Sequence, residues 1–430
     1  MADEGSSRNG AVAITGLGAV TPLGVGLAES WRGLTAGRSG IHAITRFATE
    51  GLRTTIAGTI DFLGVDPVTP PSLSHALAEM AAREALAQSG IYERDGGAGR
   101  FPGQLFVAAP PIEHDWSSRV ALAHLPTARP ESPYCRADGT RIPNTERRAL
   151  HVDFINGTLA DRLAAEFGTE GSPITLTTAC ASGGTAIQLG VEAIRRGACP
   201  AALAIGTDGS IQEEALIRFS LLSALSTAND APEKASRPFA KDRAGFVMAE
   251  GAGCLVLEDL DFARARGARI LATIRGCGEA ADTFHRTRSN PDGKAIIRCM
   301  SEAIADAGLQ PEDVGFINAH GTGTPENDKM EGFGIAQVFG AHADGVAVSS
   351  NKSMIGHTLT AAGTVEAAFT ALSVIEGVLP PTINYETPDP ALDLDVVHGV
   401  ARRAPVEFAL SNSFGFGGQN VSLLIAAADA

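Results

Sequence analysis

Two stretches of this sequence share one order: a strand, a small-residue turn with a reactive side chain, and a helix. In the first, β-branched residues dominate 173–178, the turn holds Cys180, and apolar residues recur at helical spacing over 185–196. In the second, the turn holds Lys352 and His357. Self-similarity on this scale predicts a duplicated α/β unit whose two copies face each other.

The length of the chain agrees with two units. A chain of 430 residues with 44% hydrophobic content exceeds what one simple core usually holds. Its 49 glycines and its aromatic content of only 5% favour α/β layers over a β-sandwich. We expect a frayed tail over residues 1–10, a first half over 11–266 and a second half over 267–430.

Hydrophobic periodicity predicts the remaining elements. Strands are expected over 11–14, 104–108, 200–205, 254–257, 270–275, 314–318, 346–350, 408–412 and 421–425, and helices over 27–36, 72–89, 154–167, 213–225, 262–266, 294–307 and 361–375. Gly16 and Gly18 suggest a dinucleotide-binding loop. Thr21, however, stands where the third glycine of that motif belongs, and no βαβ continuation follows, so nucleotide binding is disfavoured.

Charge and cysteine usage argue against several classes of protein. The formal net charge of −15 leaves no broad basic face for a general nucleic-acid or anionic-membrane binder. The 6 cysteines form no C-x-x-C pair and no histidines cluster at zinc-ligand spacing, so we expect a cytoplasmic protein without disulfides or a metal site. The polar N-terminus does not resemble a signal peptide, and no apolar run approaches the roughly 20 residues of a membrane span.

One long segment, residues 110–148, interrupts the first half with prolines and without periodicity. Such an insertion in a compact domain is usually a lid, a pocket wall or an interface arm. The alternative is a tolerated surface excursion.

Cys180 is the first candidate for chemistry. Its turn precedes a helix, and the free N–H groups and positive dipole at a helix N-terminus favour thiolate over thiol. Small neighbours leave room for a substrate at the sulfur, which is the setting of an activated nucleophile. The alternative is a buried structural thiol.

Two histidines and one carboxylate add to this candidate site. His320 and His357 each adjoin a glycine at a turn after a strand, where backbone without a Cβ permits close approach, and such turns collect ligands in α/β sheets. Glu366 stands in an otherwise uncharged helix, so burial would require a cation, and Lys352 is the nearest candidate. The alternative places Glu366 in solvent.

Four motifs carry a resemblance to a known family. Thr-Ala-Cys-Ala-Ser-Gly, His-Gly-Thr-Gly-Thr-Pro, Asn-Lys-Ser-Met-Ile-Gly-His-Thr and Asn-Ser-Phe-Gly-Phe-Gly-Gly-Gln-Asn resemble the β-ketoacyl-[acyl-carrier-protein] synthases of the elongating, Cys-His-His kind. The resemblance runs from about residue 12 to residue 425. It implies the thiolase fold, a five-layered α/β/α/β/α arrangement of two similar halves, usually as a homodimer.

The resemblance also implies roles for the candidate residues. Cys180 would take an acyl group as a thioester, with the backbone N–H groups of Cys180 and Phe416 as the oxyanion hole. His320 and His357 would promote decarboxylation of the malonyl unit and stabilise the enolate. Lys352, paired with Glu366, would orient the two histidines and hold the local charge.

Further positions are implied to bind the substrate. Thr322 and Thr324 match positions that hydrogen-bond the phosphopantetheine arm, Phe416 matches an aromatic gate, and Phe414 is placed with them. No metal or redox cofactor is implied, because the phosphopantetheine arrives on an acyl carrier protein.

This sequence departs from the housekeeping members of the family in two places. A glycine-rich turn is replaced by Pro-Pro-Ile-Glu-His-Asp-Trp at 110–116, and Ser223 stands where an arginine is often found. Along with Ser223, the helix beginning near residue 72 lacks the basic cluster that commonly meets an acidic carrier protein. On so acidic a chain, docking would need local basic patches, and the candidates are 147–148 and Arg286 with Arg288. These departures suggest a dedicated pathway, such as very-long-chain acyl groups for a bacterial envelope lipid or a polyketide-like product.

Two other functions fit the same resemblance. A thiolase acting on coenzyme A thioesters would want a second catalytic cysteine near the C-terminal glycine loop, and residues 411–418 contain none. A chain-length-factor partner subunit usually lacks the nucleophile, whereas Cys180 and both histidines are present here.

Overall fold

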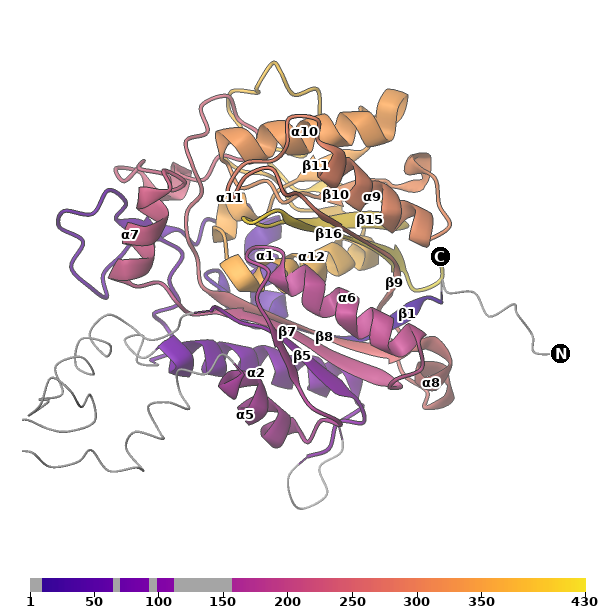
Figure 1. Ribbon diagram of the computed structural model, residues 1–430. Coiled ribbons are helices and arrows are strands. Elements are labelled where there is room, and N and C mark those ends of the chain that lie inside the picture. The colour runs from indigo at the N-terminus through magenta and orange to yellow at the C-terminus, as the bar shows by residue number, and fades with distance from the viewer. Residues whose placement is uncertain (1–9, 65–69, 93–98, 112–156) are drawn as a thin grey trace, which may run out of the picture.

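The computed structural model describes residues 10–64, 70–92, 99–111 and 157–430 (Figure 1). Nearly all of the expected tail and insertion, with the 147–148 patch, therefore lie outside the described residues. The strands are β1 Val12–Thr21, β2 Gly24–Val25, β3 His42–Ala43, β4 Ile56–Ala57, β5 Gln104–Ala108, β6 Ile174–Leu176, β7 Ala201–Asp208, β8 Gly251–Asp259, β9 Ala272–Ala281, β10 Phe316–Asn318, β11 Ala347–Ser349, β12 Val378–Leu379, β13 Asp395–Val396, β14 Arg402–Arg403, β15 Phe408–Phe414 and β16 Gln419–Ala427. The helices are α1 Leu27–Thr35, α2 Pro70–Ser89, α5 Thr158–Phe167, α6 Ser182–Arg195, α7 Glu213–Leu221, α8 Leu260–Ala265, α9 Lys294–Asp306, α10 Pro325–Phe339, α11 Lys352–Ile355 and α12 Ala362–Glu376, with short 3₁₀ turns at Pro232–Lys234, Pro311–Asp313, Gly340–His342 and Leu359–Ala361.

Five layers follow one another in the order helix, sheet, helix, sheet, helix (Figure 1). Helices α2 and α5 form one outer layer, α6 and α12 lie in the centre, and α9 and α10 form the other outer layer. Hydrogen bonds connect the strands between them in the order β13-β11-β10-β15-β16-β9-β1-β8-β7-β5-β6. The five-layered α/β arrangement expected from the resemblance is confirmed.

Strand β1 is longer than the sequence predicted. We expected a strand over 11–14 followed by a glycine loop, but β1 continues through Thr21. The glycines serve helix packing, because a Cβ on Gly16 or Gly18 would lie 2.0 Å from a backbone carbonyl oxygen of α2. Gly16 and Gly18 therefore allow a close helix–strand contact and do not form a turn.

Strand β9 repeats this feature in the second half. A Cβ on Gly276 or Gly278 would lie 2.0 Å from a backbone carbonyl oxygen of α9. Strands β1 and β9 also pair with each other antiparallel, with Ala13 opposite Thr273, which connects the two halves of the sheet. The two copies thus show the same helix–strand packing and meet at equivalent strands.

The central helices α6 and α12 approach each other through glycine. A Cβ on Gly183 would lie 2.5 Å from the backbone nitrogen of Thr364, and one on Gly363 would lie 2.2 Å from that of Gly184. The segment Leu359–Glu376 is apolar and long enough to cross a membrane, but 83% of it is buried inside the protein. It is a core helix, and its burial brings the N-termini of the two central helices together.

Candidate active site

Cys180 lies in the turn between β6 and α6, and that turn is strained. Ala179 has a φ of 49°, a region that non-glycine residues rarely adopt. The hydroxyl of Ser182 stabilises the turn by donating to the carbonyl of Ala179 and accepting from the N–H of Thr178. Backbone strain of this kind is common where a side chain must be presented to a substrate.

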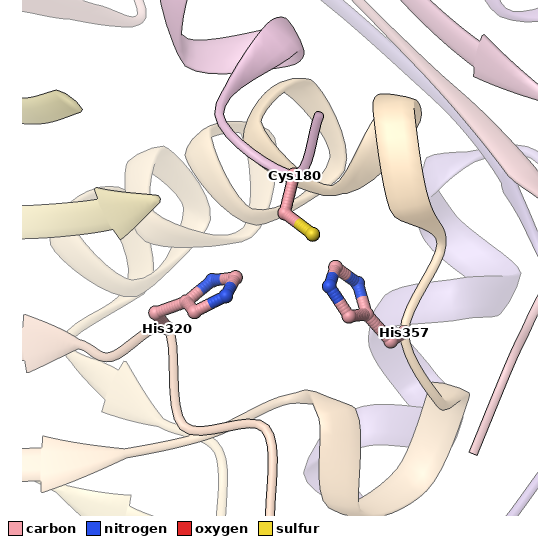
Figure 2. A group of neighbouring side chains, drawn as sticks. All are labelled: Cys180, His320 and His357. Carbon is pink, nitrogen blue, oxygen red and sulfur yellow. The ribbon is translucent and has the colours of Figure 1, made fainter. Parts of the chain in front are cut away.

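The second half supplies two imidazoles to the same point. His320 follows β10 and His357 follows α11, and parallel pairing of β10 with β11 sets the two turns side by side. The Cys180 sulfur and one nitrogen from each ring all lie within 4.8 Å of one another, and the three side chains converge as Figure 2 shows. The ring centroids of the histidines are 5.3 Å apart. One thiol from the first half and two imidazoles from the second therefore form one cluster.

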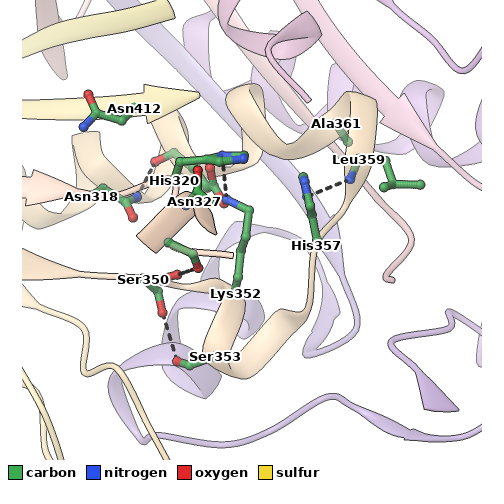
Figure 3. Close-up of polar contacts among 12 residues, drawn as sticks. Asn318, His320, Asn327, Ser350, Lys352, Ser353, His357, Leu359, Ala361 and Asn412 are labelled. Atoms are coloured by element: carbon green, nitrogen blue, oxygen red, sulfur yellow. Dashed lines mark hydrogen bonds and ion pairs between the residues drawn. The ribbon is translucent and has the colours of Figure 1, made fainter. Parts of the chain in front are cut away.

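The tautomer of His357 is set by the backbone. The N–H of Leu359 donates to Nδ1 of His357 over 3.2 Å (Figure 3). A backbone N–H can only donate, so Nδ1 is unprotonated and the proton of the neutral ring resides on Nε2. Nε2 has no hydrogen-bond partner within the described part of the chain, which leaves this N–H for a ligand.

Lys352 gives His320 the same tautomer. Its ammonium lies 3.4 Å from Nδ1 of His320 and can only donate, so the His320 ring proton resides on Nε2 as well (Figure 3). The backbone N–H groups of His320 and Gly321 donate to the buried carboxylate of Glu331 at 2.8 Å, which fixes the turn. Burial and the nearby Lys352 charge lower the pKa of both His320 and His357 well below 6.5, so both rings are neutral at pH 7.

Lys352 also forms an ion pair with Glu366, and each side chain is only 1% exposed. The solvent-exposed alternative for Glu366 is therefore wrong. Burial raises the pKa of Glu366 to about 7, against the opposing effect of the Lys352 charge. The lysine thus connects the carboxylate of α12 to the imidazole of His320.

The charge state of Cys180 differs from the one expected from the sequence. Burial raises the pKa of the thiol to about 11, while a hydrogen bond from the Phe416 backbone and the Lys352 charge oppose the shift. The predicted lowering of this pKa by the helix N-terminus is wrong, because desolvation of a fully buried sulfur outweighs the dipole. The thiol is protonated at rest, and nearby N–H donors must stabilise the thiolate when it forms.

A cavity of about 450 Å³ opens over the cluster. It is lined by Cys180, by both histidines and by four more of the residues singled out from the sequence, namely Thr322, Thr324, Phe414 and Phe416. Arg286, Arg288 and Ser223 line it too. Lys352 and Glu366 do not line it, and Lys352 contacts His320 from outside the cavity.

Sequence reasoning missed Glu331 and Asp328, which are both fully buried on α10. They accept backbone N–H bonds from His320, Gly321 and Gly323 and so shape the turn that carries His320. No helix was expected over 325–339, because the segment Pro-Glu-Asn-Asp-Lys-Met-Glu is charged and has no apolar stripe. A Thr-Pro helix start at Thr324 was the available signal, and Thr324 does cap α10.

Within the described residues, two groups of side chains have donor sets that suit a metal ion. The thiol and two imidazoles of the cluster match the soft and borderline ligands that Zn²⁺ prefers. His75, Glu79 and Glu166 form the other group, but Arg83 already forms ion pairs with both of its carboxylates.

Comparison with known proteins identifies the family. The model of the beta-ketoacyl synthase N-terminal domain matches residues 9–263, and that of the beta-ketoacyl synthase C-terminal domain matches residues 271–386. The chain belongs to the β-ketoacyl synthase family. The resemblance found in the motifs is therefore confirmed.

Relatives of this β-ketoacyl synthase come from two kinds of biosynthesis. The 3-oxoacyl-[acyl-carrier-protein] synthase 2 of Coxiella burnetii is 37% identical over 424 residues, which cover 96% of this chain and 98% of that protein. The ishigamide ketosynthase/chain length factor has a TM-score of 0.81 at 34% identity, over 97% of this chain and 99% of that one. A type II PKS ketosynthase in complex with its acyl-carrier protein, bound to the hexaketide, has a TM-score of 0.84 at 30% identity, over 98% of this chain and 100% of that one.

Proposed function

We propose that this protein is a 3-oxoacyl-[acyl-carrier-protein] synthase, an acyltransferase that joins a cysteine-bound acyl group to a malonyl unit with loss of CO₂. The observation that carries the proposal is a thiol and two neutral imidazoles in one cavity, each ring with its proton on Nε2. A nucleophile and two hydrogen-bond donors are what acyl transfer followed by enolate formation requires.

The first step is acyl transfer to Cys180. The sulfur, as thiolate, attacks the carbonyl carbon of the incoming acyl thioester, and the carbonyl becomes an oxyanion. The N–H groups of Cys180 and Phe416 are assigned to that oxyanion, and the Phe416 N–H already contacts the sulfur. The bond to the pantetheine sulfur then breaks, and that sulfur leaves as a thiolate that takes up the proton released by Cys180.

The second step uses the two histidines. When the malonyl thioester loses CO₂, the electron pair of the broken C–C bond moves into the thioester and places negative charge on its carbonyl oxygen. The Nε2–H groups of His320 and His357 are assigned to donate to that oxygen, since contacts at Nδ1 leave the ring protons on Nε2. The enolate carbon then attacks the Cys180 thioester, the S–C bond breaks, and the thiolate is regenerated.

Lys352 and Glu366 are assigned to hold this arrangement. The Lys352 ammonium pairs with Glu366 and lies 3.4 Å from Nδ1 of His320. Because an ammonium has no lone pair, it can only donate to Nδ1, and so it maintains the tautomer with the proton on Nε2. Its charge also favours the Cys180 thiolate.

The carrier protein is assigned to the cavity side that Arg286 and Arg288 line. Guanidinium groups suit both a phosphodiester and the acidic surface of a carrier protein. Thr322 and Thr324, whose hydroxyls lie 2.8 Å apart, are assigned to the amides of the pantetheine arm, and Phe414 and Phe416 to the acyl chain.

A homodimer is the proposed assembly. Strand β6 ends the strand order and pairs only with β5 among the described strands, and Ile174 on it is 42% exposed. An open edge with an exposed apolar residue is a natural place for a second copy to add a strand. A cytoplasmic location is likewise proposed, on the scattered unpaired cysteines of the sequence.

The specific product belongs to the proposal as well. The departures at 110–116 and Ser223, together with relatives from fatty-acid and polyketide assembly, support a dedicated elongation pathway. Two alternative functions fit less well. A thiolase would need a second cysteine over 411–418, where this chain has none. A chain-length-factor subunit would not need the intact thiol–imidazole cluster found here.

Separate assays of the two half-reactions test this function. Wild-type protein should become acylated at Cys180 by acyl-carrier and should release CO₂ from malonyl-carrier. Cys180→Ala should abolish acylation with the fold intact, and His357→Ala should reduce CO₂ release far more than acylation. Absence of a covalent adduct on wild-type Cys180 would favour the chain-length-factor subunit. Acyl primers of graded length would then define the pathway, and a preference for medium chains on a housekeeping carrier would reject a dedicated one.

A further inference from the structure

Asp208 is a buried carboxyl group that the reaction above does not use. It ends β7 in the first half, is 1% exposed, and contacts the turn that follows His357 in the second half. Its oxygens are hydrogen-bonded to Ser210 and Thr360, and no cation within the described part of the chain pairs with it. An isolated buried carboxylate is costly, so its protonation state needs an explanation.

One hydroxyl proton decides that state. Oγ1 of Thr360 lies 2.7 Å from the carbonyl oxygen of Thr207 and 2.8 Å from Oδ2 of Asp208. A carbonyl oxygen only accepts, and a threonine hydroxyl has a single proton to donate. If the single proton is not shared between two acceptors, both short contacts are hydrogen bonds only when Thr360 donates to Thr207 and Asp208 donates to Thr360. The carboxyl group must then carry a proton on Oδ2.

The other oxygen agrees with this assignment. Oδ1 of Asp208 accepts the Ser210 N–H at 3.1 Å and the Ser210 hydroxyl at 2.6 Å, so it is the unprotonated oxygen. Burial raises the pKa of Asp208, which is the same direction. Cys180 is the titratable group on which Asp208 acts, since a negative Asp208 would raise the pKa of the thiol further. A neutral Asp208 removes that penalty on the thiolate.

Thr360 connects this contact to the imidazole. It follows Leu359, which has a φ of 49° and whose N–H donates to Nδ1 of His357. The backbone N–H of Thr360 also points at Oδ2 of Asp208, at 3.3 Å. We propose that Asp208 is a positioning residue. As a neutral acid it donates a hydrogen bond to Thr360, and so it holds the turn in which the Leu359 N–H sets the His357 tautomer.

Infrared spectroscopy tests the proton directly. The difference spectrum between wild type and Asp208→Asn at pH 7.5 (roughly neutral conditions, where an ordinary aspartate is ionised) should contain the C=O stretch of a protonated carboxyl group, shifted in D₂O. A carboxylate band in its place would overturn the proposal. This measurement does not depend on any activity.

Kinetics test the positioning role, and this arm rests on the proposed function. Asp208→Asn keeps donation to Thr360 and acceptance from Ser210 and loses only the 3.3 Å contact, so kcat for CO₂ release should fall by no more than about fivefold. Asp208→Ala and Thr360→Val should lower kcat at least about 20-fold with KM within about threefold, while Thr360→Ser rescues.

Controls separate these outcomes from misfolding and from failure of the function. Ser373→Ala removes a buried hydroxyl that bonds Phe369 at the far end of α12, and should change kcat less than about threefold. If Asp208→Ala does not fold, Thr360→Val carries the test. Equal losses in Asp208→Asn and Asp208→Ala would overturn the neutral acid. No CO₂ release by wild type would reject the proposed function and leave the infrared result standing.

Discussion

Lys352 and Glu366 form an ion pair in which each side chain is 1% exposed. Removing one partner of such a pair leaves an uncompensated charge and typically costs about 3–5 kcal/mol. Because Lys352 also contacts His320, the same ion pair affects both the stability of the fold and the tautomer of His320.

Replacement of Lys352 by methionine should make stability strongly pH-dependent. The pKa of Glu366 in the fold, about 7, already exceeds its usual 4.5, so its contribution to stability is present below pH 4.5 and is lost as the pH rises through 7. Loss of Lys352 raises the folded pKa further. Urea unfolding should therefore show a loss relative to wild type that is small at about pH 5, is about 1 kcal/mol at about pH 8, and grows by up to about 1.4 kcal/mol for each further pH unit. Lys352→Met/Glu366→Gln is the control and should remove this pH dependence; a loss equal at both pH values would contradict the explanation.

Alkylation of Cys180 should follow a high thiol pKa. With a pKa of about 11, the thiolate is a minor species at pH 7, so the rate of reaction with iodoacetamide should keep rising about tenfold per pH unit above pH 8. Cys180→Ala supplies the background from the other cysteines. A rate that stops rising below pH 8 would show that the N–H donors around the sulfur lower the thiol pKa by more than burial raises it.

Zinc ions should inhibit the enzyme at its nucleophile. The Cys180 sulfur and the imidazoles of His320 and His357 lie within 4.8 Å of one another, a donor set that suits Zn²⁺. Added Zn²⁺ should block acylation reversibly, with EDTA restoring it, and prior acylation of Cys180 should protect the enzyme. His357→Ala should weaken inhibition at least about tenfold by removal of one ligand. Zinc binding to Cys180→Ala with the same affinity and stoichiometry as to wild type would place the ion elsewhere.

Alanine at Gly16 should destabilise the fold. Its Cβ would lie 2.0 Å from the carbonyl oxygen of Ala85, so α2 must move away from β1. We expect a loss of at least about 2 kcal/mol in the free energy of unfolding. Gly315→Ala is the matched control, since its Cβ would meet Val406 at an ordinary 3.4 Å, and it should cost less than about 1 kcal/mol. Equal effects at the two positions would contradict the packing role.

The elements predicted from periodicity were largely those found. The helix expected over 361–375 is α12 at Ala362–Glu376, and the strand over 104–108 is β5 at the same residues. These segments are mostly apolar, and such a pattern follows from burial and does not depend on the details of packing. Helix α10 was missed, because its buried acids Asp328 and Glu331 look like surface residues until their backbone donors are known.

The residues of the site could be predicted from the sequence, but their charge states could not. Motifs pointed to Cys180, His320 and His357, because turns after strands place side chains at one edge of the sheet. The charge state of Cys180 depends on how completely the sulfur is desolvated, which only the packing of both halves determines. Asp208 gave no signal, since its role depends on a single hydroxyl from the other half.

The antiparallel pairing of β1 with β9 is how two identical subunits would meet across a two-fold axis. A chain in which this contact is internal has the geometry of an ancient dimer whose genes fused. After fusion, the two copies no longer have to be identical, as they must be when a two-fold axis relates them. One copy here keeps the sulfur and the other keeps the imidazoles, so a single asymmetric centre replaces two equivalent ones.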